Sequence, residues 1–218
     1  MESLDEIIAR QGTSGWADSW QPRRLDPRHD EDMLALRRIL ESELCVRVED
    51  TIVDQIADLL ETRMPGRKIP AARRADEAQN HVGDVDIRMY GIWVYYPWRR
   101  AVVHVLPEAE YRELRTSRNR NKITLEEQSR MSGLRIAIAG LSVGRATAVT
   151  LAMEGTGGEF RLADFDALDL SNLNRLRGSV LEIGVNKAVL TARELFELDP
   201  FLRVRIFESG INDDNIAA

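Results

Sequence analysis

Residues 134–144 read Leu-Arg-Ile-Ala-Ile-Ala-Gly-Leu-Ser-Val-Gly. The first six are apolar except for one arginine, which is typical of a buried strand, and they lead into a helix predicted over 143–154. A glycine-rich turn between strand and helix lets backbone N–H groups approach phosphate at the positive helix end. Gly140, Ser142 and Gly144 are therefore candidate cofactor-binding residues. Because the pattern is G-x-S-x-G rather than G-x-G-x-x-G, a tight turn that binds nothing fits it as well.

The chain on either side of this turn alternates strands and helices. A second strand is predicted over 160–163, a helix over 186–198 and a third strand over 202–207. This order predicts an α/β fold: a partial Rossmann-like parallel sheet with crossover helices. Thr124 and Glu127 form a capping-box pattern, which predicts a preceding helix to about Ser132.

Asp164 stands at the end of the second strand, 164 − 140 = 24 residues after Gly140. An acid about 20 residues beyond such a turn can accept a hydrogen bond from a ribose hydroxyl. Ligands of open α/β sheets bind at the carboxyl ends of the strands, which favours this interpretation over an ordinary loop aspartate.

The segment 163–175 reads Ala-Asp-Phe-Asp-Ala-Leu-Asp-Leu-Ser-Asn-Leu-Asn-Arg. It resembles the D-x-D-x-[IVL]-x-x-S-N-L-x-R signature of the ubiquitin-activating (ThiF/MoeB/HesA) family. Gly184-Val-Asn-Lys187 resembles the family's Gly-x-x-Lys, and residues 118–123 resemble its arginine-bearing segment. The resemblance covers about 118–218 and implies the first half of an adenylating domain.

This resemblance implies ATP-dependent adenylation of a carboxyl group, with the C-terminus of a ubiquitin-like or sulfur-carrier protein as the acyl substrate. ATP and Mg²⁺ are the implied cofactors. The implied roles are ribose binding by Asp164, ordering of the loop or metal region by Asp166, phosphate binding by Asn172, Arg175 and Lys187, and contact with the terminal phosphates by Arg120, often from the partner subunit of a dimer.

Some parts of the family pattern have no counterpart in this sequence. The metal-binding aspartate after a fourth strand, the thioester cysteine and the Cys-x-x-Cys pairs cannot be assigned. A three-stranded half-sheet would also leave an unpaired edge and an uncovered apolar face. We therefore expect a fragment, a homodimer or a partner chain that completes the sheet.

Composition excludes several classes of function. The net charge of 30 − 36 = −6 gives no sign of the excess positive charge that nucleic-acid-binding proteins carry. A single cysteine, Cys45, the lack of a signal sequence and the lack of an apolar run of about 20 residues suggest a cytoplasmic protein with no membrane partner. The three lysines among 30 basic residues are Lys68, Lys122 and Lys187, and the last two fall in segments that resemble the family.

Residues 1–115 are predicted to form a small α+β domain for docking or dimerisation, followed by the nucleotide-binding half-domain at 116–218. Its elements are helices from Asp30 to Leu44 and over 50–63, and a hairpin within 86–106. A short helix is possible at 2–10, and 11–30 and 64–84 are predicted to be loops. His104, within the hairpin, is interpreted as structural.

Two other functions remain open from sequence. A NAD- or FAD-dependent oxidoreductase component would share the strand, turn and Asp164, but would leave Asn172, Arg175 and Lys187 without a common role. A truncated, non-catalytic nucleotide-binding or interaction module would explain why no metal aspartate or reactive thiol can be assigned.

Overall fold

The computed structural model describes residues 19–42, 45 and 47–216. The helix predicted at 2–10 lies outside the described residues. The helices and strands, in chain order, are β1 (Arg23–Leu25), α2 (Asp30–Leu40), β2 (Arg47–Asp50), α3 (Ile52–Arg63), α4 (Arg74–Val82), β3 (Ile92–Tyr96), β4 (Ala101–Val105), α5 (Glu108–Arg115), α6 (Leu125–Ser132), β5 (Arg135–Ala139), α7 (Leu141–Met153), β6 (Glu159–Ala163), α8 (Lys187–Leu198) and β7 (Arg203–Phe207).

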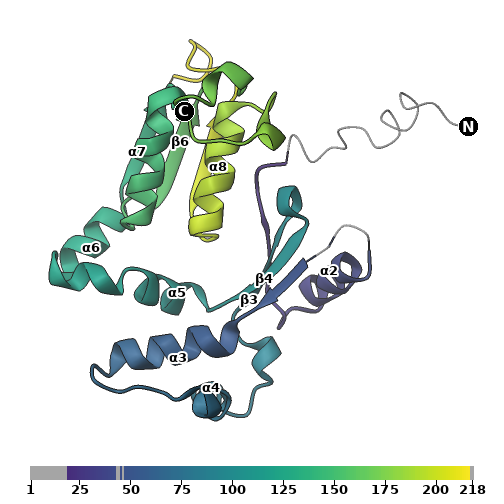
Figure 1. Cartoon of the computed structure of the whole chain (residues 1–218), viewed down its shortest axis with the longest axis vertical. Coiled ribbons are helices and arrows are strands. Elements are labelled where there is room, and N and C mark those ends of the chain that lie inside the picture. Colours follow the sequence, from purple (N-terminus) through teal and green to yellow (C-terminus); the bar gives the residue numbers. More distant parts are fainter. Residues whose placement is uncertain (1–18, 43–44, 46, 217–218) are drawn as a thin grey trace, which may run out of the picture.

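The C-terminal sheet confirms the predicted α/β fold class. Strands β5, β6 and β7 pair in this order and are parallel throughout. Helices α7 and α8 pack side by side on one face of the sheet (Figure 1). Within the described chain, β5 and β7 each pair with β6 alone, so both outer edges of the sheet are open, as expected for half of a Rossmann-like unit.

The other face of this sheet differs from the expected apolar surface. At its amino end, Glu159 forms ion pairs with Arg135, Arg161 and Arg205, one arginine from each strand. The hydrogen bond from Arg161 is the main reason that the pKa of Glu159 is lowered. The prediction of an apolar face is therefore wrong for the amino end, because charged residues occupy the outward positions of all three strands.

A second sheet, in the order β1-β3-β4-β2, lies N-terminal to the first. Its centre is the antiparallel β3–β4 hairpin, which confirms the hairpin predicted from sequence. His104 of β4 is fully buried, stacks on Trp93 at 4.1 Å between ring centroids, and contacts the Asp50 carboxylate and the Tyr90 carbonyl through its two ring nitrogens. These contacts agree with a structural role for His104.

Three predictions in the N-terminal half are wrong. The segment 64–84 is not a loop, because it contains α4, whose Ala78 is fully buried against the α3 cluster. The helix that begins at Asp30 ends at Leu40 rather than Leu44, and the chain then forms the unpredicted strand β2. The short strand β1 interrupts the loop predicted at 11–30. Mostly polar helices and strands of three or four residues have too little periodicity to be recognised from sequence.

The two sheets share one hydrophobic cluster. Val94, Tyr96 and Val105 of the hairpin belong to the same buried cluster as Phe160 of β6 and Leu195 of α8. Hydrogen bonds join the same elements, because the Tyr96 hydroxyl donates to the Phe196 carbonyl at 3.1 Å. The hairpin is therefore packed against the α7–α8 layer of the parallel sheet.

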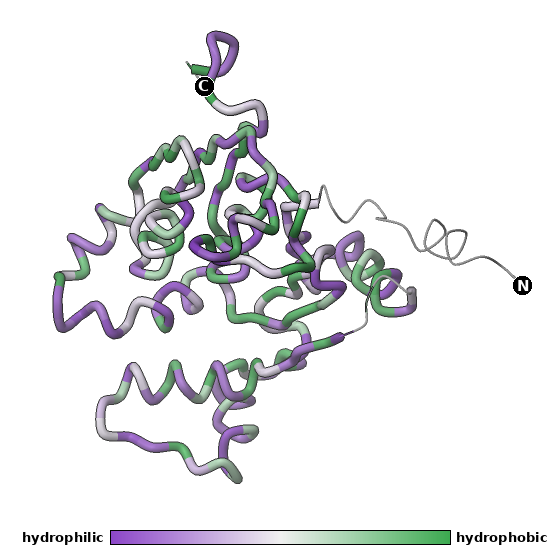
Figure 2. Tube along the Cα trace, turned by 45° about the horizontal axis from the view of Figure 1, so that its top comes forward, coloured by the Kyte–Doolittle hydropathy of each residue, from purple (hydrophilic) through white to green (hydrophobic). Residues whose placement is uncertain are grey.

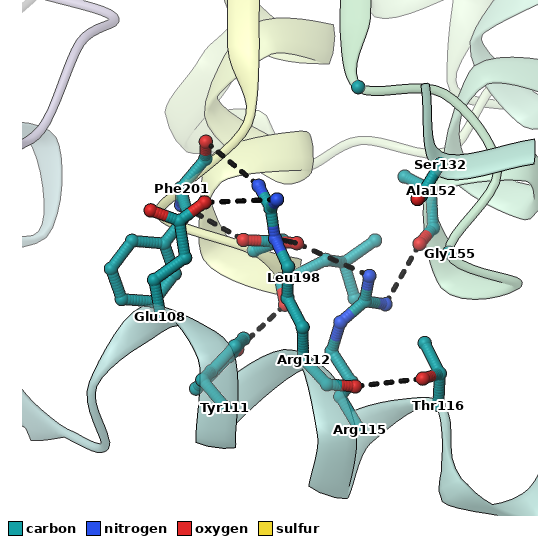
Figure 3. Close-up of polar contacts among 12 residues, drawn as sticks. Glu108, Tyr111, Arg112, Arg115, Thr116, Ser132, Ala152, Gly155, Leu198 and Phe201 are labelled. Atoms are coloured by element: carbon teal, nitrogen blue, oxygen red, sulfur yellow. Dashed lines mark hydrogen bonds and ion pairs between the residues drawn. The ribbon is translucent and has the colours of Figure 1, made fainter. Parts of the chain in front are cut away.

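Helix α5 connects the two sheets through polar contacts (Figure 3). Arg115 donates to the carbonyl oxygen of Ala152 at 2.8 Å, near the C-terminus of α7, where a cation is favourable. It also pairs with the buried carboxylate of Asp199 at 3.3 Å, while Arg112 donates to the carbonyl of Phe201 at 3.2 Å. The arginines of α5 thus hold the ends of α7 and α8 in place.

Tyr111 of α5 gives this interface a pH dependence. Its hydroxyl donates to the Leu198 carbonyl at 2.8 Å, and burial raises its pKa from 10.0 to about 12. Above pH 10 the unfolded chain loses this proton while the folded chain keeps it, so the free energy of unfolding falls with rising pH. Between pH 10 and 12, Tyr111→Phe should reduce that slope by about 1.4 kcal/mol per pH unit.

Urea unfolding of both proteins at pH 8, 9, 10 and 11 measures this effect. The two slopes should coincide below pH 9, where the tyrosine is protonated in both states. Equal slopes above pH 10 would contradict the prediction.

Beyond β7 the chain projects from the sheet as a mostly hydrophilic segment, which Figure 2 shows at the C-terminal end. Its apolar residues Ile211 and Ile216 line a cavity of about 220 Å³ with Phe207 of β7 and the alanines of the open sheet face. No helix in the described part of the chain is long and apolar enough to cross a membrane.

Candidate nucleotide-binding site

The predicted site begins at the N-terminus of α7. Gly140 is the N-cap residue and has a φ of 82°, in the left-handed region that favours glycine. The next backbone N–H, that of Leu141, donates to Asp164 Oδ2 at 2.6 Å. Asp164 Oδ1 accepts from the backbone N–H of Asp166 at 2.8 Å. The buried Asp164 therefore joins the end of β6 to the beginning of α7, and its carboxylate retains lone pairs for a further donor.

A buried lysine lies beside this helix end. Lys187 is the first residue of α8 and is 6% exposed. Its Nζ donates to Asp166 Oδ2 at 2.9 Å and to Ser142 Oγ at 3.4 Å. Lys187 is therefore not an ordinary surface residue: its ammonium is buried, and these two partners compensate its charge.

The beginning of α8 is fixed by its N-cap residue, Asn186. The side chain of Asn186 accepts from the backbone N–H of Ala188 at 2.7 Å and donates to the Asp164 carbonyl at 3.0 Å. Lys187 thus starts its helix at the carboxyl end of β6, which brings Ser142, Asp164, Asp166 and Lys187 together.

Asn172 and Arg175 lie on the loop between β6 and α8. Asn172 is buried, and its Oδ1 accepts from the backbone N–H of Asp169 at 3.1 Å, so the side chain shapes the loop. Arg175 donates to the Ser171 carbonyl at 3.1 Å and to Asn174 Oδ1 at 2.9 Å. Its guanidinium has five donors, so it can bind an anion while it keeps these contacts.

A cavity of about 280 Å³ extends along α7 from this point. Its lining includes Ser142, and its charged residues are Arg145, Arg175, Arg177, Lys187 and Glu194. These charges sum to 4 − 1 = +3, whereas the whole chain carries −6. The arrangement concentrates positive charge at a helix N-terminus, which is the physical requirement for binding phosphate.

Gly144 has a packing role in this structure. A Cβ at this position would lie 2.4 Å from Cγ2 of Ile138 on β5, so only glycine allows the close approach of helix to strand. In G-x-G-x-x-G turns, the third glycine has this role of allowing close packing of helix against strand. When that pattern is laid on the sequence from Gly140, its third glycine falls on Arg145. The sequence analysis did not single out Arg145, although an arginine at the position of the pattern's third glycine was a signal that could have indicated it.

Arg120 lies away from the site in its own chain. It lines a separate cavity of about 420 Å³ that also contacts Gly157 and Gly158, at the amino end of β6, and it pairs with Glu113 at 3.5 Å. Gly140 follows the carboxyl end of the parallel neighbour β5. The structure therefore brings six of the predicted residues together, while the Asn172 side chain bonds within its own loop. It sets Gly144 behind them as a packing residue and leaves Arg120 at the opposite end of the sheet.

Within the described residues, no group of three or more His, Cys, Asp or Glu side chains could hold a metal ion. The donors that converge on the cavity are cations, a hydroxyl and backbone N–H groups, which suit phosphate oxygens.

The fold and site define the C-terminal half as a Rossmann-like unit with a cationic cavity at its first helix. Residues 116–218 match the model of the ThiF family. The chain is 50% identical over 124 residues to the uncharacterized protein MT1398 of Mycobacterium tuberculosis, covering 57% of this chain and 17% of that protein. It is 31% identical over 96 residues to a probable molybdopterin-synthase adenylyltransferase of Porphyra purpurea, covering 43% of this chain and 25% of that protein.

Solved structures with similar folds include E. coli TcdA, a tRNA N6-threonylcarbamoyladenosine dehydratase, in complex with ATP. The TM-score is 0.46 at 24% identity, over 52% of this chain and 46% of that chain. E. coli MccB with ATP gives a TM-score of 0.37 at 31% identity, over 39% of this chain and 26% of that chain. The chain thus spans less than half the length of each of these relatives.

Proposed function

We propose that this chain contributes the nucleotide-binding half of an enzyme that adenylates a carboxyl group with ATP. A substrate carboxylate would attack the α-phosphorus of ATP, a P–O bond to the β-phosphate would break, and an acyl adenylate and pyrophosphate would form. The proposed acyl substrate is the C-terminus of a ubiquitin-like or sulfur-carrier protein, and Mg²⁺ would accompany ATP.

The contact that carries this proposal is the pairing of Lys187 with Asp166 and Ser142 at the N-terminus of α7. An oxidoreductase that binds NAD would use Asp164 and the turn but has no need for a buried lysine and several arginines beside them. Attack at phosphorus builds negative charge on phosphate oxygens, and fixed cations in a partly enclosed cavity stabilise that charge. The match of residues 116–218 to the ThiF family model supports the same function.

Nucleotide binding is the first test. Isothermal titration of the full chain with ATP–Mg²⁺ should give binding that is at least tenfold tighter than that of NAD. Tighter binding of NAD than of ATP would favour the oxidoreductase alternative.

Chemistry is tested separately by exchange of labelled pyrophosphate into ATP in the presence of a candidate carrier protein. Exchange that depends on the carrier's C-terminal carboxylate would support adenylation. ATP binding without exchange would support the non-catalytic nucleotide-binding module.

We also propose that the chain forms a homodimer. Because Arg120 lies at the opposite end of its own sheet, it could reach terminal phosphates only in a second chain, as a homodimer would allow. The division into domains at 1–115 and 116–218 stays a prediction.

A further inference from the structure

We infer that Arg145 and Arg177, held together by Glu194, bind the terminal phosphates of the nucleotide from within the same chain. This inference rests on the proposed function and adds two residues to it. Neither residue belongs to the set that the family signature indicates, and Arg145 stands where a dinucleotide-binding turn has its third glycine.

Glu194 of α8 accepts from both arginines, one with each carboxylate oxygen. Arg145 Nε lies 2.9 Å from Oε2, and Arg177 Nη1 lies 3.0 Å from Oε1. The pair between Arg145 and Glu194 is largely buried, with side-chain exposures of 14% and 16%, while Arg177 is 78% exposed. One carboxylate therefore positions two guanidinium groups at the wall of the cavity that also contains Ser142, Arg175 and Lys187.

The donors of Arg145 are only partly used. Among the residues that the structure describes, its guanidinium bonds to Glu194 alone, through Nε, so both terminal nitrogens keep their N–H groups for another acceptor. A guanidinium fork of this kind binds two oxygens of one phosphate group, which a lysine cannot do. One negative charge on Glu194 offsets only one of the two arginines.

The position of Arg120 strengthens this assignment. An arginine at the amino end of the sheet cannot contact the terminal phosphates of a nucleotide bound at the carboxyl end of the same sheet. Arg145 and Arg177 line the cavity at that carboxyl end, so a single chain already carries cations for these phosphates. Arginines supplied within the chain or by a partner are alternative solutions in phosphoryl-transfer enzymes.

The test compares ATP with AMP, which lacks the terminal phosphates, by isothermal titration of the full chain. Arg145→Gln should weaken ATP binding about ten- to hundredfold and leave AMP binding within about twofold, because a charge-assisted pair is lost at the terminal phosphates alone. Arg177→Gln should also weaken ATP binding more than AMP binding, but by a smaller factor, because exposed charges are screened by solvent. Arg205→Gln, on the opposite face of the sheet, is the matched control and should bind both nucleotides as the parent chain does.

Glu194→Gln separates phosphate binding from a purely structural role. It breaks both ion pairs but keeps both arginines, so ATP affinity should be retained or increased. Equal losses of ATP and AMP affinity in Arg145→Gln and Glu194→Gln, with equal falls in Tm, would overturn the inference. The inference would also be overturned if Arg120→Gln lost the preference for ATP over AMP while Arg145→Gln kept it. If the parent chain binds neither nucleotide, the proposed function itself fails, which is a distinguishable result.

Discussion

Lys187→Met should reduce the affinity of the chain for ATP about 100-fold, the largest effect that we expect of a single substitution at the site. Lys187 is buried between Asp166 and Ser142 at the N-terminus of α7, and it is the one lysine in the lining of the cavity. A hydrogen bond between charged groups contributes about 1.5–3 kcal/mol, which corresponds to roughly ten- to 150-fold in affinity.

The same substitution should change stability little. Asp166, which loses its partner, has a side chain that is 53% exposed, so water can solvate its carboxylate. Lys187→Arg should not restore ATP binding, because the larger planar guanidinium does not fit the buried position of a compact ammonium. Lys68→Met is the control, since Lys68 is an exposed lysine that pairs with Glu61 far along the chain from the site.

Isothermal titration with ATP and thermal unfolding of each variant measure these effects. ATP affinity in Lys187→Met equal to that of the Lys68→Met control, with unchanged Tm, would contradict the assignment of Lys187 to phosphate.

Asp199→Ala should lower the free energy of unfolding by about 3 kcal/mol, the largest effect on stability that we expect. Asp199 is 1% exposed and accepts from Arg115 at 3.3 Å and from the backbone N–H of Phe201 at 2.9 Å. Removing one partner from a buried ion pair leaves the other charge uncompensated, which costs about 3–5 kcal/mol. The lower end of this range applies here, because Arg115 keeps its hydrogen bonds to the carbonyl groups at the end of α7.

Urea unfolding monitored by circular dichroism measures this loss. Asp199→Asn keeps an acceptor for the Phe201 N–H and should lose less stability than the alanine variant. Asp213→Ala, at an exposed aspartate beyond β7, should leave the unfolding midpoint unchanged. A loss below about 1 kcal/mol in Asp199→Ala would show that the contact between α5 and the α8–β7 junction contributes little to stability.

The parallel sheet and most of the site could be predicted from the sequence because their signals are local. An apolar run, a glycine turn and a helix cap specify β5 and α7 within a few residues of each other. Asp164 ends the β5–α7–β6 crossover and Lys187 begins the helix of the next one, β6–α8–β7, so the fold has little freedom to separate them. The loop residues Asn172 and Arg175 lie within this second crossover.

The amino-acid sequence by itself thus determined the α/β class, the hairpin and the residues that meet at the carboxyl end of the parallel strands. Only the tertiary structure decided that Glu194 holds Arg145 against the cavity, that Gly144 serves packing, and that Arg120 lies at the far end of the sheet. It also decided that the arginines of α5 pair with Asp199. Those contacts join residues from different helices and loops, and their formation depends on how layers pack, which no local periodicity records.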